Sequence, residues 1–495
     1  MPYFAAMNRC LLLFCLLLCR PLAAQDFAWT PGLQRAYVDL LKLKVASARQ
    51  TLTGEPVTNG MHIYTDDFAD MVTLLVADEE QAFNQLAKRE DQRLSQLQKL
   101  DSKSPWQRLM QAEVRLHWAF VKLKFGKEIS ASWDIIRAYK LLAENQKLYP
   151  SFIPTYKSLG VLHIMIGSVP ENYTWVTNLL GLKGSIRQGL LEIQRAQQDP
   201  IFRTESQMIE LLVRAYITQF TDADQQKLKG LVQEHPDNLL IHFFAGTTAM
   251  KNGRSEQALA YLLDRPSGPA YLAMPIIYNL LGDIYLQKGR YQQALQQYQQ
   301  FLTTYRGQNF LKDSYYKQFL CYWLTNNDTR AIPLLQQVQQ VGHTVVESDK
   351  AAQKFAESFF SKTISSQQKI LMQARLATDG GYLDTALTLM RSYPEAHFIQ
   401  LPDRAEYNYR LGRIYQRSHE PDQAIPCFER AIALSESAQL SFGATSALQL
   451  GYIYQQKRNI AKARQYFEKA LSYKKHEYKN SVDNKARAGL TSLEE

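Results

Sequence analysis

The stretch that decides the fold runs from Ile277 to Tyr305 and reads IYNLLGDIYLQKGRYQQALQQYQQFLTTY. Large and small apolar residues recur about one helical turn apart in its first half and again in its second half: Tyr278, Leu281 and Tyr285, then Ala294, Tyr298 and Phe301. Gly289 lies between the two halves, where the first helix must end and the chain reverse. The stretch predicts two short helices that pack closely where Gly282 and Ala294 carry little or no side chain.

These offsets resemble the tetratricopeptide repeat (TPR), a helix–turn–helix unit of about 34 residues. Two further copies close the chain, at Leu411-Gly412 with Ala424 and Phe428, and at Leu450-Gly451 with Ala463 and Phe467. The resemblance covers residues 239–475 well and 105–236 weakly. It implies an all-α fold, a right-handed superhelical solenoid of TPR-like helix–turn–helix repeats with an extended concave surface.

A second resemblance concerns residues 179–190, LLGLKGSIRQGL. They are similar to a segment of a eukaryotic TPR family that includes a mitochondrial inclusion-clearance protein, in which an aromatic residue stands in place of Leu182. Exported bacterial TPR proteins are the closer comparison for the chain as a whole. Gly160 and Gly189 are 29 residues apart, against 12 between Gly282 and Ala294, so an insert at about residues 168–185 delays the second helix of this repeat.

The repeat pattern divides the chain into four predicted parts. They are a signal peptide (1–24), an N-terminal helical region with degenerate repeats (25–150), a TPR-like solenoid with the insert (151–400), and a C-terminal TPR pair with a capping helix (401–495). Within the second part, Thr65–Leu100 lacks Gly and Pro and keeps a helical period, with Thr65-Asp66-Asp67 as its expected N-cap and first turn. We read the acidic group of Asp66, Asp67 and Asp70 as a consequence of that helix start.

The first 24 residues predict export. Arg9 precedes an apolar run, Cys10–Cys19, that is shorter than the roughly 20 residues needed to span a bilayer, and Ala23-Ala24 ends the leader with small residues. Removing the leader's two arginines takes the formal charge from +10 to +8. We expect the periplasm or the outer membrane of a Gram-negative bacterium.

No signature of an enzyme or a metal site stands in the sequence. G-x-S-x-G, H-E-x-x-H, P-loop and strand-linked G-x-G-x-x-G motifs are missing, and the nine histidines do not share ligand spacing. Cys321 and Cys427, which remain after export, lie far apart on different repeats. We therefore expect no catalysis, no metal and no small-molecule cofactor.

The sharpest binding hypothesis concerns the first helices of the two C-terminal repeats, which line the concave groove of a TPR stack. Arg410, Arg413 and Arg417 recur there at three and four residues. Tyr409 and Tyr452 flank them, and Gln456 follows. Arginine forks pair well with carboxylates, so this pattern predicts an acidic peptide or a C-terminal carboxylate as ligand, against the alternative of a solvated charged face.

The insert gives a second hypothesis. Trp175, Leu179, Leu180 and Leu182 make it apolar, so it could enter a lipid interface or pack back on its own solenoid. The basic tail Lys469–Lys485 could meet an anionic envelope surface, whereas we expect no nucleic-acid partner after export.

The sequence thus favours an exported TPR scaffold that binds a protein or peptide partner on its concave surface. Two alternatives stay open. One is a structural or assembly factor of an outer-membrane complex, and the other is an unrecognised enzyme in the N-terminal region, residues 25–150, where the repeats are weakest.

Overall fold

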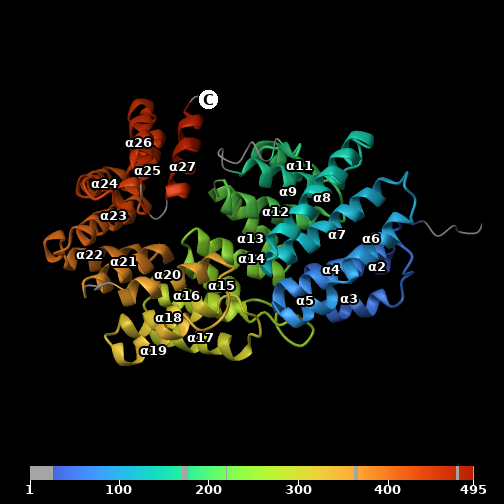
Figure 1. The fold of residues 1–495 in the computed structure, drawn as a ribbon, viewed down its shortest axis with the longest axis horizontal. Coiled ribbons are helices and arrows are strands. Elements are labelled where there is room, and N and C mark those ends of the chain that lie inside the picture. Colours follow the sequence, from blue (N-terminus) through green and yellow to red (C-terminus); the bar gives the residue numbers. More distant parts are fainter. Residues whose placement is uncertain are drawn as a thin grey trace, which may run out of the picture. The chain divides into compact units, whose positions relative to one another are not determined.

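The computed structural model describes residues 26–169, 177, 179–218, 220–361, 366–474, 476 and 479–493. These residues form α-helices and a short 3-10 helix and contain no strand, which confirms the predicted all-α class (Figure 1). The predicted leader, residues 1–24, and Trp175 of the insert lie outside the described residues.

The chain folds into two compact units. The first comprises Met1–Ser168, Val176–Glu210 and Ser267–Leu272. Its described helices are α2 (Pro31–Leu41), α3 (Val45–Leu52), α4 (Gly60–Ala77), α5 (Glu80–Leu86), α6 (Arg89–Gln98), α7 (Pro105–Lys124), α8 (Glu128–Leu148), α9 (Thr155–Gly167), α11 (Ile186–Ala196) and the start of α12 (Arg203–Tyr216).

The second unit comprises Val169–Trp175, Leu211–Pro266 and Ala273–Glu495. Its described helices are the end of α12, α13 (Asp222–Glu234), α14 (Leu239–Lys251), α15 (Ser255–Leu263), α16 (Ile276–Gln287), α17 (Tyr291–Thr304), α18 (Leu311–Trp323), α19 (Asp328–Val338), α20 (Glu347–Ser361), α21 (Gln368–Gly380), α22 (Leu383–Ser392), η2 (Glu395–His397), α23 (Leu401–Arg417), α24 (Pro421–Ser435), α25 (Ser441–Gln456), α26 (Ile460–Ser472) and α27 (Lys479–Ser492). The predicted boundaries at residues 150 and 400 stay predictions.

The hairpin predicted over residues 277–305 is confirmed as α16 and α17. Gly289 joins the two helices with a φ of +74°, a conformation that glycine adopts without a steric penalty. Gly282 lies against the ring of Tyr298 rather than against Ala294, because a Cβ atom at Gly282 would come within 2.5 Å of that ring. The fully buried Tyr298 ring therefore occupies the space that the glycine leaves.

The two C-terminal hairpins repeat this packing. In α23 and α24, Gly412 lies against the ring of Phe428, and in α25 and α26, Gly451 lies against the ring of Phe467. Both rings are fully buried. A small residue on the first helix and an aromatic ring on the second thus set the close approach in each of these hairpins.

The delayed second helix of the Gly160 repeat is also confirmed. Gly160 of α9 lies against the backbone of Gly189 and against Ile193, both in α11. The two helices pair although the insert separates them in the sequence.

The helix predicted from Thr65 to Leu100 is wrong in its boundaries. Three helices, α4, α5 and α6, cover this region, and Asp78 ends α4 in the left-handed conformation with a φ of 59°. The start also differs, because α4 begins at Gly60 with the Asn59 side chain accepting a hydrogen bond from the Met61 amide. Asp66 and Asp67 therefore lie in the middle of α4 rather than in a first turn.

Candidate functional site

The predicted partner-binding residues lie on α23 and α25 of the second unit. Arg410 pairs with Glu406 one turn earlier, with 2.7 Å between Nη2 and Oε1, and its guanidinium lies over the Tyr409 ring. Tyr409 also packs against the rings of Phe428 and Phe442. The charge of Arg410 is therefore neutralised within its own helix.

Arg413 connects the two helices and keeps its charge. It donates to Gln416 Oε1 at 2.8 Å and to Gln449 Oε1 at 2.7 Å. Both acceptors are neutral amides, and among the described residues no carboxylate pairs with this guanidinium. A half-buried arginine held by two amides is oriented, and its positive charge is available to a ligand.

Arg417 has a different environment from Arg413. It donates to the carbonyl oxygens of Thr378 and Gly253, the second at 3.2 Å, and so links the ends of α14, α21 and α23. Burial, and then the nearby Arg413 charge, lower the pKa of the Arg417 guanidinium. Most of its hydrogen-bonding capacity is used within the chain.

The remaining predicted residues differ in exposure. Tyr452 is half-buried and packs edge-on against Phe467, and burial raises the pKa of its hydroxyl. Gln456, at the end of α25, is exposed. The structure thus keeps all six residues on α23 and α25. Arg410 and Arg417 are engaged within the chain, whereas Arg413 and Gln456 are open to a ligand's polar groups.

Sequence reasoning missed Lys485, which lies near both Arg413 and Lys251. Burial lowers the pKa of the Lys485 ammonium on α27, and the nearby positive charges of Lys251 and Arg413 lower it further. Lys251, the last residue of α14, lies over the ring of Tyr216, a side chain that is 49% exposed. We call Lys251, Arg413 and Lys485 the basic cluster. No pattern in the sequence connects these residues, since they come from three distant helices.

The described part of the insert is partly buried. Leu182 is only 7% exposed, and the Tyr139 hydroxyl on α8 donates to the Lys183 carbonyl at 3.0 Å. Leu179, by contrast, is 77% exposed, and Leu180 is half-buried. Trp175 is not among the described residues.

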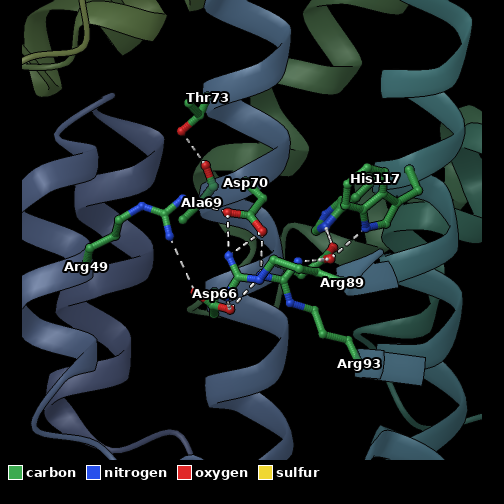
Figure 2. Close-up of polar contacts among 10 residues, drawn as sticks. Arg49, Asp66, Ala69, Asp70, Thr73, Arg89, Arg93 and His117 are labelled. Carbon is green, nitrogen blue, oxygen red and sulfur yellow. Dashed lines mark hydrogen bonds and ion pairs between the residues drawn. The ribbon is translucent and has the colours of Figure 1, made fainter. Parts of the chain in front are cut away.

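The acidic group of α4 forms a charge network in the first unit (Figure 2). Asp70 is fully buried and accepts from three arginines. They are Arg49 of α3 at 2.7 Å, Arg89 of α6 at 2.8 Å, and Arg93 of α6 at 2.6 Å. The acidic residues of α4 therefore pair with arginines of two neighbouring helices. The prediction that they stabilise the start of a helix is wrong.

The network continues into α7. The buried Asp67 carboxylate contacts Arg93 at 2.8 Å, His117 Nδ1 at 2.8 Å and the Trp118 indole nitrogen at 2.9 Å. Burial raises the pKa of Asp66, but the charges and hydrogen bonds of Arg93, Arg89 and Arg49 outweigh that effect and lower it overall.

A second buried chain of charges crosses α7, α9 and α12. The Lys157 ammonium contacts Glu113 at 2.9 Å and Glu205 at 3.0 Å, and the Tyr37 hydroxyl donates to Glu205 at 2.5 Å. Burial opposes the charged form of Lys157, yet Glu113 and Glu205 hold its pKa well above the usual value. These groups satisfy one another, so we assign them to fixing helix positions.

The described residues contain no group of three or more histidine, cysteine or acidic side chains arranged to hold a metal. Within that same part of the chain, no helix is both long and apolar enough to cross a membrane.

Comparison with known families identifies two regions. The family model Iml2/Tetratricopeptide repeat protein 39 matches residues 92–306, and a tetratricopeptide repeat model matches residues 403–476. The predicted TPR resemblance is confirmed, and the segment 179–190, which we compared with a eukaryotic TPR family, lies within the first match. The exported bacterial type stays a prediction.

Several solved structures are similar at low identity. The human IFIT1 dimer with PPP-AAAA is 14% identical with a TM-score of 0.30, over 90% of this chain and 96% of that chain. The TPR domain of P58(IPK) is 12% identical with a TM-score of 0.22, over 84% and 96%. Naa15/Naa10 bound to HypK-THB is 13% identical with a TM-score of 0.25, over 93% and 65%. No curated protein matches the chain.

Proposed function

Since the chain is a tetratricopeptide repeat protein that resembles the Iml2/TPR39 family, we propose that it is an exported scaffold that binds a protein or peptide partner and carries out no catalysis. The TPR-repeat fold is that of a protein-interaction scaffold, because stacked helix pairs leave an extended surface free for a partner. We place this scaffold in the periplasm or at the outer membrane of a Gram-negative bacterium.

The observation that carries the proposed site is the basic cluster. Lys251, Arg413 and Lys485 contribute three positive charges from α14, α23 and α27, and none of them pairs with a carboxylate among the described residues. Keeping like charges together without a counterion is unfavourable, and an anionic ligand would relieve that repulsion. We propose that an acidic protein or peptide supplies this charge.

The predicted site residues have distinct roles in this proposal. Arg413 and Gln456 contact the partner directly. Tyr409 and Tyr452 form the apolar support beneath them, and Arg410 stays paired with Glu406. Arg417 positions α23 against α14 and α21 through its contacts with backbone carbonyls.

A pull-down tests the proposal. The mature chain, tagged at its C-terminus, is cross-linked to envelope fractions, and the captured proteins are compared with those of Lys251→Glu/Arg413→Glu/Lys485→Glu. Lys229→Glu/Arg306→Glu/Arg391→Glu is the matched control, because all three side chains are exposed and lie in the same unit. We expect a defined partner that the control retains and the cluster variant loses. A partner retained equally by all three proteins, or no partner, contradicts the proposal.

Leu179 supports one addition, peripheral association with the envelope. Its side chain is 77% exposed, next to the half-buried Leu180, and such a leucine could enter a lipid interface. Flotation with anionic liposomes measures this, and Leu179→Ser should reduce it. If the wild-type chain does not float, the membrane role is wrong.

A further inference from the structure

A surface groove in the first unit is lined by arginines of α11. The groove has a volume of about 470 Å³. Its lining residues come from α8, α9, the N-cap of α11 and α11 itself: Gln146, Tyr156, Ser185, Arg187, Gln188, Leu191, Glu192 and Arg195.

Charged and apolar side chains alternate along the outer edge of this groove. Arg187, Leu191 and Arg195 follow at intervals of four residues, so they form one stripe along α11. Both arginines are exposed, and Leu191 between them is 60% exposed. The two arginine Cα atoms lie about 12 Å apart along the helix axis, from a rise of about 1.5 Å per residue.

Arg195 is already held in place. Its guanidinium lies 4.0 Å from the centre of the Tyr156 ring, and its Nη2 donates to the Pro150 carbonyl at 2.8 Å. The Tyr156 hydroxyl donates to the same carbonyl at 2.7 Å. An arginine fixed by an aromatic ring and a carbonyl loses less entropy when it binds a ligand.

Neither arginine has an acidic partner within the described residues. The carboxylate that lines the groove, Glu192, is buried and already bonded to His163 at 2.5 Å and to Gln188 at 3.1 Å. The groove therefore presents two positive charges on either side of an apolar side chain, and the acid that lines it is already hydrogen-bonded within the chain.

We propose that this groove binds an acidic segment of a partner protein in which two carboxylates flank one apolar side chain. In an extended segment, residues i, i+2 and i+4 share a face and span about 13 Å, which matches the distance between the arginines. The carboxylates pair with Arg187 and Arg195, and the central side chain covers Leu191. This surface lies on the second helix of its repeat, in the first unit, whereas α23 belongs to the second unit.

A displayed library of random peptides, selected on the immobilised mature chain, tests the proposal without a known partner. The selected peptides should share two acids around an apolar residue. Arg187→Glu/Arg195→Glu should lower their retention at least tenfold, and retention should fall as salt rises. Replacing the two acids by Asn or Gln in a selected peptide should abolish its binding.

Two controls separate binding from folding. Arg187→Glu alone leaves the contact between Arg195 and Tyr156 intact, and it should still weaken retention. Arg306→Glu/Arg391→Glu makes the same charge change in the other unit and should leave these peptides bound. The proposal is overturned if no peptides are enriched, if they lack the acidic pattern, or if they bind Arg187→Glu/Arg195→Glu as well as the wild type while far-UV circular dichroism shows an intact fold.

Discussion

Arg413 and Arg417 lie one helical turn apart on α23, yet their guanidinium groups donate to different kinds of acceptor. Arg413 donates hydrogen bonds to two side-chain amides, whereas Arg417 donates to backbone carbonyls at the ends of α14 and α21. Removing Arg417 takes away the donor of the Gly253 carbonyl, while the Thr378 carbonyl keeps its bond from the Gly381 amide. Removing Arg413 affects neither carbonyl. We therefore expect substitution of Arg417 to lower stability and substitution of Arg413 to weaken partner binding.

We predict that Arg417→Ala lowers the free energy of unfolding by about 1–3 kcal/mol, through the Gly253 carbonyl left unsatisfied and the lost contact with Thr378. Arg413→Ala should cost under about 1 kcal/mol and should weaken partner capture instead. Urea denaturation followed by circular dichroism measures the first effect. Equal destabilisation by the two substitutions would contradict these assignments.

A second residue-scale prediction concerns Asp70. Its fully buried carboxylate faces Arg49, Arg89 and Arg93. Asp70→Asn removes the charge that these arginines share, and breaking such a buried network typically costs about 3–5 kcal/mol. Asp222→Asn is the control, since that carboxylate pairs with Arg254 and is almost fully exposed. Thermal denaturation should show a large shift for Asp70→Asn and almost none for the control.

At the scale of helices, the packing of α16 on α17 gives a direct test of the hairpin. Gly282→Ala places a methyl group against the Tyr298 ring, which is buried and donates through its hydroxyl to Asp283 at 2.8 Å. The ring cannot move without losing that bond, so we predict a loss of about 1–3 kcal/mol.

Gly230→Ala in α13 provides the matched control, because a Cβ atom there has no neighbour within 4 Å. This substitution should stabilise the protein by about 0.5–1 kcal/mol through helix propensity. Opposite signs for the two glycines are the expected result. Equal effects would mean that the packing of Gly282 against Tyr298 does not set the hairpin.

The contact between α18 and α20 should depend on pH. The buried Asp349 of α20 accepts from the amides of Phe310 at 2.6 Å and Asp313 at 2.9 Å, and burial raises its pKa from 3.8 to about 6. The folded state therefore binds the proton more tightly than the unfolded chain. The resulting stabilisation is complete below pH 3.8 and is lost as pH rises through about 6.

We predict that, as pH rises from 4 to 7, ionisation of Asp349 lowers the wild-type free energy of unfolding by up to about 3 kcal/mol. This follows from roughly 1.4 kcal/mol per pKa unit. Asp349→Asn lacks this titration, so its stability should change less over the same range. Chemical denaturation at several pH values measures both proteins. Parallel pH profiles would show that Asp349 does not titrate in this range.

At the scale of the whole molecule, the sequence predicted correctly how helices within one repeat pair with each other. The hairpin around Gly289 and the delayed pairing of Gly160 with Gly189 follow from periodicity and small residues, so they were predictable. The arginine partners of Asp70 were harder to find, since Arg49 and Arg89 lie on other helices. The spacing of Arg89 and Arg93, four residues like that of Asp66 and Asp70, was the only signal.

The basic cluster was not predictable, because Lys485 approaches Lys251 and Arg413 only when the repeats of the second unit stack. A repeat pattern gives the pairing of neighbouring helices but not which side chains of distant repeats meet. The distinction between Arg413 and Arg417 has the same origin, since the carbonyl partners of Arg417 lie on α14 and α21.

The central claim is that the basic cluster binds the carboxylates of a partner. Zero-length carbodiimide cross-linking of the captured complex, followed by peptide mass spectrometry, tests it most directly, because this reagent joins only amines and carboxylates in contact. We predict bonds from Lys251 or Lys485 to Asp or Glu of the partner, lost at both lysines when Arg413→Glu repels the ligand. A complex whose cross-links avoid both lysines would contradict the claim.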